Sequence, residues 1–133
     1  MEYVESFREL EVYKFAEQLS MQIFEVTKSF PREEMYSLTD QVRRSSRSIG
    51  AQIAEAWGKR EYEKHFVSKL TDADSEQLET QHWIETALNC SYISKEKSLI
   101  LLKQCAVIGK MLNSMMKKSS SFCNKSKKKT SRN

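Results

Sequence analysis

The sequence predicts an all-α fold, an antiparallel up-down four-helix bundle followed by a disordered basic C-terminal tail. Only three Gly and one Pro occur in 133 residues, whereas a β-sandwich or barrel needs a turn about every 8–12 residues. Four segments place apolar residues at helical spacing, and the short connections between them make neighbouring helices antiparallel. The length fits one domain, so we assign residues 1–118 to the bundle domain and residues 119–133 to a Lys-rich tail.

A proline separates the first two predicted helices. The first helix carries an apolar residue at alternating intervals of four and three positions, namely Val12, Ala16, Leu19, Ile23, Val26 and Phe30. Pro31 ends it, because proline disfavours helical geometry in the preceding residue. The second helix carries the stripe Leu38, Val42, Ser45, Ile49, Ile53 and Ala56. We expect Ser37 or Thr39 to cap its start and Gly58 to mark the break that follows it.

The third and fourth predicted helices meet near Ser94. The third covers about residues 61–93 and carries the stripe Phe66, Leu70, Ala73, Ile84 and Leu88. Gln77 and Gln81 interrupt that stripe with two amides. We expect Ser94 to cap the fourth helix, whose stripe is Leu101, Cys105, Ile108, Leu112 and Met115. After Lys118 the periodicity stops, and the composition becomes typical of disorder.

The positive charge of the chain is concentrated in the tail. The net charge is +4, but residues 119–133 hold five basic side chains and no acidic one. The rest of the chain holds 17 basic and 18 acidic side chains, so the bundle is nearly neutral. This balance argues against a bundle that binds nucleic acid over its whole surface.

The cysteines and the N-terminus indicate a cytoplasmic protein. Cys90, Cys105 and Cys123 are odd in number and form no C-x-x-C pair, so we expect free thiols. We assign the first two to the core and the third to the tail. Residues 1–5 lack the basic and apolar regions of a signal peptide, and no apolar run approaches the ~20 residues of a membrane span. We therefore expect no membrane partner.

Aromatic residues exceed what one narrow bundle core accommodates. They are Tyr13, Phe15, Phe24, Trp57, Tyr62, Trp83 and Tyr92. Some of these side chains must lie on outer faces, where a second apolar stripe signals association. We therefore expect a homo-oligomer.

No reaction centre is predicted. Glu79 and His82 have the Glu-x-x-His spacing of di-iron bundles, but that site needs a second such pair, and Tyr62 occupies the matching position before His65. The motifs of zinc proteases, phosphate-binding loops and hydrolase nucleophiles are absent. We interpret the acidic cluster on the third helix as a solvated or salt-bridged face. We therefore expect no enzyme, no catalytic or metal-binding residue and no cofactor.

Basic residues follow the second helix and the turn after it. They are Arg43, Arg44, Arg47, Lys59, Arg60 and Lys64. Arg43 and Arg47 lie one helical turn apart and share a face, and each guanidinium can donate two hydrogen bonds to a phosphate. Asp40 precedes two of the arginines by three and four positions, and Glu55 precedes Lys59 by four, so we expect part of the charge to be neutralised locally. Nucleic-acid contact and salt bridging within or between subunits are both open interpretations.

Three blocks of the sequence carry motifs that are well separated along the chain. Residues 7–13 fit the pattern F-x-x-L-x-V-[WY]. Residues 30–45 contain F-P-x-x-E and then L-x-x-Q-[IV]-R-R-[AS]. Residues 48–57 fit S-I-x-x-N-I-A-E, with Gln52 where Asn is usual. Over about residues 6–118 the chain resembles the four-helix bundle family of the 23S rRNA intervening-sequence protein.

The resemblance implies an assembly and a class of partner. Members of the family form homopentamers around a central channel, and some are encoded within insertions in ribosomal RNA genes. A related protein, the accessory protein of diversity-generating retroelements, partners a reverse transcriptase and nucleic acid. No catalytic residues are established for the family, so none is transferred to this chain.

Our leading hypothesis is a non-enzymatic homopentameric bundle that binds RNA or a protein–nucleic-acid complex, such as one with a nucleic-acid-processing protein. The alternative is a protein-binding adaptor or scaffold without nucleic-acid contact, in which the arginines form intersubunit salt bridges. The arginines and the aromatic excess fit both hypotheses, because each arginine can meet a phosphate or, on a neighbouring subunit, an acid such as Asp72 or Asp74.

Overall fold

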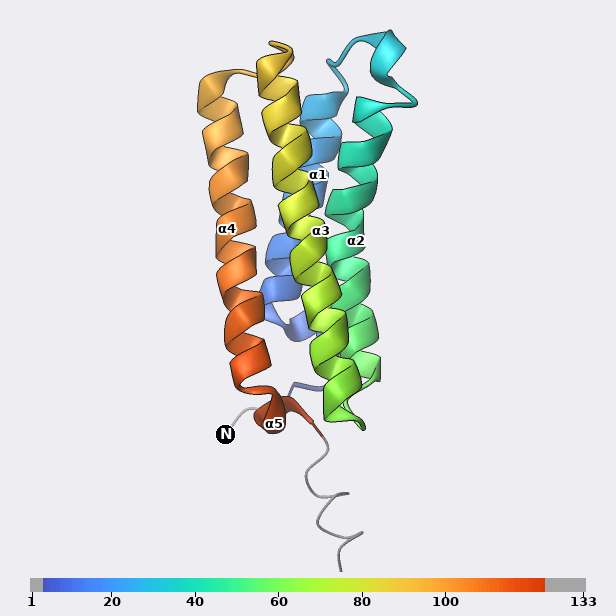
Figure 1. The fold of residues 1–133 in the computed structure, drawn as a ribbon, viewed down its shortest axis with the longest axis vertical. Helices are drawn as coiled ribbons and strands as arrows, with labels where there is room; N and C mark the ends of the chain where they lie inside the picture. Colours follow the sequence, from blue (N-terminus) through green and yellow to red (C-terminus); the bar gives the residue numbers. More distant parts are fainter. Residues whose placement is uncertain (1–3, 124–133) are drawn as a thin grey trace, which may run out of the picture.

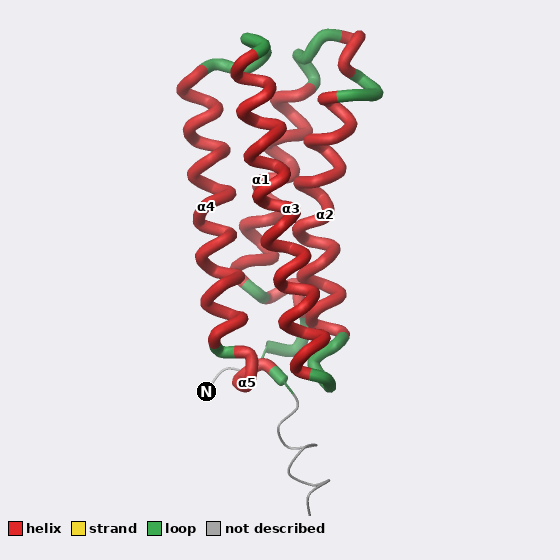
Figure 2. The backbone as a smooth tube through the Cα atoms, viewed as in Figure 1, coloured by secondary structure: helices red, strands yellow, loops and turns green. Residues whose placement is uncertain are grey.

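Four long helices make up most of residues 4–123, which are the residues that the computed structural model describes. The long helices are α1 (Glu11–Thr27), α2 (Leu38–Gly58), α3 (Glu63–Asn89) and α4 (Lys95–Lys117). The short helices are η1 (Phe7–Glu9), η2 (Arg32–Glu34) and α5 (Ser119–Phe122). Figure 1 shows the long helices side by side with alternating directions, and Figure 2 shows helices joined by short loops throughout the described chain. The predicted antiparallel four-helix bundle is confirmed.

The core is built from the predicted stripes. The largest fully buried side chains are Val12, Leu19, Ile23, Ile49, Ile53, Phe66, Leu70, Thr80, Leu101, Cys105, Ile108 and Leu112. Burial of each large apolar side chain stabilises the bundle by about 1.5–3 kcal/mol. The polar Thr80 is tolerated because its hydroxyl lies 2.8 Å from the Glu76 carbonyl oxygen and 2.9 Å from the Ser45 hydroxyl. The hydroxyl is therefore hydrogen-bonded within the core.

Helix α3 ends earlier than predicted. Ser91 adopts the left-handed conformation, with φ of 63°, and the helix ends at Asn89. The Ser91 amide donates to the Leu88 carbonyl and the Tyr92 amide to the Ala87 carbonyl, each at 2.9 Å. These two bonds form a Schellman motif, in which glycine usually occupies the left-handed position. Serine at this position gave no sequence signal for the end of the helix.

The start of α2 differs from the prediction, whereas the start of α4 agrees with it. The side chain of Ser37 donates to Glu34 Oε1 at 2.6 Å and does not cap the helix. The same carboxylate oxygen accepts the Leu38 amide at 3.3 Å, so Glu34 replaces the predicted cap. The Ser94 hydroxyl accepts the Lys97 amide at 3.0 Å, as predicted.

The bundle extends past residue 118, so the predicted boundary lies five residues too early. Helix α5 packs on α3, where the ring of Phe122 stacks on that of Phe66 with centroids 5.9 Å apart. Ser119 donates a hydrogen bond to Glu63, and Cys123 is only 7% exposed. The partly buried ring of Phe122, the Ser119 hydrogen bond and the buried Cys123 together hold this short helix on the bundle. The rest of the predicted tail, with all five basic residues, lies outside the described residues.

Two further predictions concern side chains near the core. Cys105 is buried as predicted, and burial raises the pKa of its thiol to about 12. The prediction for Cys90 was wrong: it is exposed, because it lies in the turn after α3. Among the described helices, α4 alone is long and apolar enough to cross a membrane by length and composition. Its apolar stripe faces the other helices, so α4 is a core helix of the bundle.

Candidate nucleic-acid interface

The predicted basic residues fall into two groups. The first group, the α2 arginines, consists of Arg43, Arg44 and Arg47 in the first half of the helix. The second group, the basic corner, consists of Lys59, Arg60 and Lys64 around the turn between α2 and α3. The 16 positions from Arg43 to Lys59 correspond to about 24 Å along a helix. The two groups therefore contact different parts of any extended ligand.

Arg43 is a structural residue of the bundle. Its Nε donates to the Thr27 hydroxyl oxygen at 2.8 Å, and its Nη2 donates to the Phe24 carbonyl oxygen at 3.4 Å. Its guanidinium carbon lies 4.7 Å from the centroid of the Phe24 ring. These contacts fasten α2 to α1 and occupy part of the guanidinium. Arg43 is therefore less available to a phosphate than its neighbours.

Arg44 and Arg47 are exposed. Burial, the largest influence, raises the pKa of Glu76 on α3, and the charge of Arg44 acts in the opposite direction. The Arg47 guanidinium carbon lies 5.6 Å from the Phe24 ring centroid. Arg43 and Arg44 thus extend toward α1 and α3 respectively, away from Asp40.

The predicted local neutralisation of the basic residues is wrong. In the part of the chain that the structure describes, the ion pairs within 4.0 Å involve only Lys14, Lys28 and Lys69 as cations. Glu55 lies 3.2 Å from Lys69 on α3, so its ion pair is with Lys69 and not with the predicted partner Lys59. Neither basic group is paired with a carboxylate at this distance within residues 4–123.

At the basic corner, Arg60 stacks on an aromatic ring. Its guanidinium carbon lies 3.5 Å from the Trp57 ring centroid, and its Nε donates to the Trp57 carbonyl oxygen at 2.8 Å. Partial burial lowers the pKa of Arg60, but an arginine stays protonated at neutral pH. Lys59 and Lys64 are exposed on either side of it.

An exposed tyrosine lies in the middle of the basic corner. Tyr62 is 59% exposed, and its ring centroid is 5.5 Å from that of His65. An open depression of about 820 Å³ surrounds it and is lined by Glu61, Tyr62, Glu63, Lys64, His65, Val67 and Ser68. Neither Tyr62 nor His65 was assigned to the site from the sequence. The signal that was missed is the alternation of basic and aromatic residues from Trp57 to His65.

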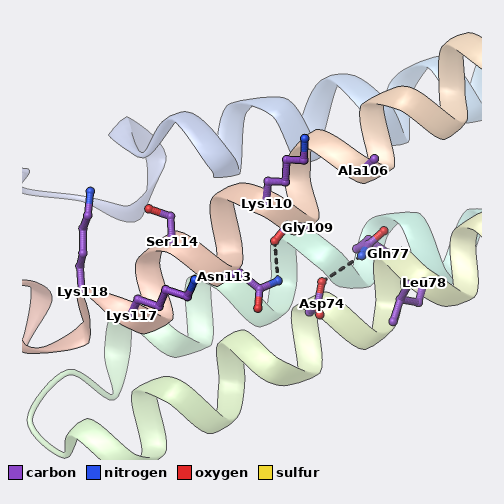
Figure 3. A pocket seen from close by; sticks show the side chains of 10 residues that line it. All are labelled: Asp74, Gln77, Leu78, Ala106, Gly109, Lys110, Asn113, Ser114, Lys117 and Lys118. Carbon is purple, nitrogen blue, oxygen red and sulfur yellow. Dashed lines mark hydrogen bonds between the residues drawn. The ribbon is translucent and has the colours of Figure 1, made fainter.

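A second groove lies between α3 and α4 and contains satisfied amides (Figure 3). Gln77 Nε2 donates to Asp74 Oδ1 at 2.9 Å, and Gln81 Nε2 donates to Gln77 Oε1 at 2.7 Å. A Cβ on Gly109 would lie only 2.8 Å from Gln77 Nε2, so glycine gives this amide its space. The two amides that interrupt the predicted stripe are therefore a structural ladder. They leave no free polar group aimed at a ligand.

Some of the seven aromatic residues lie on the outside, as predicted. Of the seven, Phe15 and Tyr62 are exposed, whereas the other five are partly buried. Wide rings at the margins of the core cover the gaps between helices, which the count of aromatics did not anticipate. The exposed apolar side chains on α1 and α4 are Phe15, Met21, Leu99, Ile100 and Val107.

The Glu79 and His82 pair does not assemble a metal site. Glu79 Oε2 accepts a hydrogen bond from Trp83 Nε1 at 3.0 Å, and the His82 ring packs edge-on against Trp83. Within residues 4–123, no group of three or more His, Cys, Asp or Glu side chains could hold a metal ion. Both side chains instead support a surface tryptophan.

These observations define the chain as a helical-bundle protein with two separate basic groups on its surface. The family model for the 23S rRNA-intervening sequence protein matches residues 8–114. The chain therefore belongs to this family, as its motifs indicated. No curated protein matches the chain.

A solved structure supports the same assignment. It is a protein with unknown function from the S23 ribosomal protein family of Bacteroides thetaiotaomicron. The two are 29% identical with a TM-score of 0.72, over 80% of this chain and 95% of the other. The similarity thus extends over nearly the whole of the solved relative.

Proposed function

We propose that this protein is a non-enzymatic, cytoplasmic homo-oligomer that binds RNA through its α2 arginines. The observation that carries the proposal is the exposure of Arg44 and Arg47 on a rigid helix, with no carboxylate within 4.0 Å among the described residues. A guanidinium in this state can donate paired hydrogen bonds to a phosphate without first breaking an ion pair. Arg43 braces the helix that presents them.

The names of the relatives support RNA as the ligand. The matching family is named after an intervening sequence of 23S rRNA, and the solved relative is assigned to a ribosomal protein family. The five basic residues between 125 and 132 add positive charge that any RNA would attract.

The proposed assembly is a homopentamer. The exposed apolar side chains of α1 and α4 offer a surface for association, and a groove between these helices is lined by Phe15, Gln18, Lys103, Gln104 and Val107. The count of five rests on the family resemblance alone. Five copies would repeat each arginine pair, so weak phosphate contacts would reinforce one another.

The second candidate is a protein-binding adaptor whose arginines bridge to acids of a neighbouring subunit. The observation that favours this candidate is the exposed apolar surface of α1 and α4, which is suited to contact with a protein. Two acids that such bridges would use are already engaged, since Asp74 accepts from Gln77 and Asp72 lies 3.8 Å from Lys69. RNA binding is therefore the first choice.

The test is RNA retention by the variant Arg44→Ala/Arg47→Ala, with molar mass followed by light scattering. Lys14→Ala/Lys28→Ala is the matched control, because it removes one exposed charge from α1 and one from the residue at its C-terminal cap. We expect the arginine variant to lose RNA retention at an unchanged molar mass and the control to retain RNA. Dissociation of the arginine variant into subunits would instead favour the adaptor. Arg43 is left in place because its loss would also break the contact with Thr27.

A further inference from the structure

We propose that the basic corner, together with Tyr62 and His65, is a platform on which unpaired RNA bases stack, so that the ligand is single-stranded RNA. This inference rests on the proposed RNA-binding function and names the form of RNA that it takes. It concerns a part of the surface about 18–24 Å away from the α2 arginines along the helix.

The tyrosine is fixed at its backbone and free at its ring. The Tyr62 amide donates to the Lys59 carbonyl oxygen at 3.1 Å, and its own carbonyl oxygen accepts the His65 and Phe66 amides at 3.0 Å. The side chain makes no capping hydrogen bond to the helix and is 59% exposed. Because the backbone of Tyr62 is held in place, its exposed ring offers a face to a base at little cost in backbone entropy. Stacking of this kind accepts any base, because every base has a π-face.

Cations lie close to the exposed ring in the sequence, and one of them, Lys64, lines the same depression. Arg60 is held on Trp57 by one ring contact and one hydrogen bond, and Lys59 and Lys64 are exposed. Two carboxylates, Glu61 and Glu63, also line the depression. The latter accepts a hydrogen bond from the Ser119 hydroxyl at 2.5 Å, so its charge is partly compensated. Aromatic faces interleaved with cations are the usual composition of a single-strand binding surface.

The C-terminal segment reaches the bundle surface at this same corner. Figure 1 shows α5 at the end of the bundle that holds the α2–α3 turn. Phe122 stacks on Phe66, and Cys123 lies close enough to Arg60 to influence its charge. The next basic residues in the sequence are Lys125, Lys127, Lys128, Lys129 and Arg132. The last described residue, Cys123, is therefore near the platform, and the strongly basic sequence that follows it favours a polyanion as the occupant.

The platform distinguishes single-stranded from double-stranded RNA. In a duplex the faces of the bases are stacked on one another, and the deep, narrow major groove keeps side chains from the base edges. The α2 arginines contact phosphates, which both forms present. An exposed tyrosine ring adds affinity only where a base is unpaired.

The experiment compares Tyr62→Ala, Tyr62→Phe and Tyr36→Ala in the full chain. The probes are a fluorescein-labelled oligoadenylate and its duplex with oligouridylate of the same length, with binding followed by fluorescence anisotropy. We expect Tyr62→Ala to weaken oligoadenylate binding by about 5- to 150-fold, the range for loss of one stacked base, and to leave duplex binding unchanged. Tyr62→Phe keeps the ring and should bind normally. Tyr36 is 91% exposed and belongs to the connection between α1 and α2, which Figure 1 shows at the opposite end of the bundle, so its replacement should have no effect.

The outcomes separate the two proposals. Unchanged oligoadenylate binding by Tyr62→Ala, or equal weakening for both probes, would overturn the stacking platform. If Tyr62→Ala gives one of these results and Arg44→Ala/Arg47→Ala loses binding to both probes, the platform fails and the proposed function stands. If the unmodified protein binds neither the oligoadenylate nor the duplex, both proposals are overturned.

Discussion

The two ends of the bundle are closed by opposite kinds of chemistry. At the end with the α1–α2 loop and the α3–α4 turn, the Tyr92 hydroxyl donates to Glu34 Oε2 at 2.8 Å, and the Phe30 ring lies 5.6 Å from the Tyr92 ring. At the other end, Arg60 covers Trp57, and Tyr62 is left exposed. We call the first the locked end and the second the basic end.

The two ends differ in how their polar groups are paired. At the locked end, Glu34 accepts hydrogen bonds from the side chains of Ser37 and Tyr92 and from the Leu38 amide, so it connects three parts of the fold. The polar groups around Glu34 at this end are therefore hydrogen-bonded to one another. At the basic end, the cations of Lys59 and Lys64 have no carboxylate within 4.0 Å among the described residues. One end is closed by hydrogen bonds between its own groups, and the other carries exposed cations without a carboxylate within 4.0 Å among the described residues.

The largest expected effect comes from the core that both ends share. Ile49→Ala should lower the free energy of unfolding by about 2–5 kcal/mol, because the side chain is fully buried and its truncation leaves a cavity. Urea denaturation followed by circular dichroism measures this. The control Leu78→Ala, at an exposed position on α3, should change stability by less than about 0.5 kcal/mol. An unchanged midpoint for Ile49→Ala would show that its stripe does not form the core.

A smaller effect of opposite sign is expected at the locked end. Ser91→Gly should stabilise the protein by about 1 kcal/mol, because Ser91 has a φ of 63° and glycine adopts this conformation without a steric cost. Ser75→Gly, at an exposed position within α3, should instead destabilise it by about 0.5–1 kcal/mol. The two melting temperatures should therefore move in opposite directions. A loss of stability in Ser91→Gly would contradict the assigned conformation.

The smallest stability effect concerns pH at the locked end. Hydrogen bonds from the Ser37 and Tyr92 hydroxyls lower the pKa of Glu34 below its ordinary value of 4.5. A lowered carboxyl pKa contributes stability above that ordinary value, and the contribution is lost as the pH falls through the folded-state pKa. Tyr92→Phe should therefore show a weaker loss of melting temperature on acidification than the unmodified protein. Tyr36→Phe is the control and should leave the pH profile unchanged. Identical profiles for all three proteins would contradict a stabilising hydrogen bond from Tyr92 to Glu34.

The sequence was sufficient to predict the parts of the fold that depend on periodicity. The stripe through Ile49 and Ile53 and the Ser94 cap follow from local spacing, and the structure confirms both. Contacts between distant segments were not predictable in this way. The stacking of Phe122 on Phe66 joins positions far apart in the chain, and its polar surroundings resemble those of a disordered tail.

The candidate site was predicted in its residues and not in its arrangement. Spacing placed Arg43 and Arg47 on one face, but it did not indicate that Thr27 and Phe24 would hold the first of them. Residue type and spacing also predicted Asp40 as a partner of Arg43 and Arg44. In the structure, Arg43 contacts α1 and Arg44 influences Glu76 on α3. Tyr62 was predicted only as one of the surplus aromatic residues. Its place at the site was not predicted, because its exposure depends on how the α2–α3 turn packs.

The measurement that tests the account most directly is the salt dependence of oligoadenylate binding. Each phosphate contact to a single strand contributes about −0.7 to the slope of log K against log salt concentration. Lys59→Ala/Lys64→Ala removes two cations from the basic end, and Lys28→Ala/Lys95→Ala removes two from the locked end. We expect the first variant to reduce the magnitude of the slope by about 1.4 and the second to leave it unchanged. Equal slopes for both variants and the unmodified protein would contradict the claim that the basic end contacts RNA.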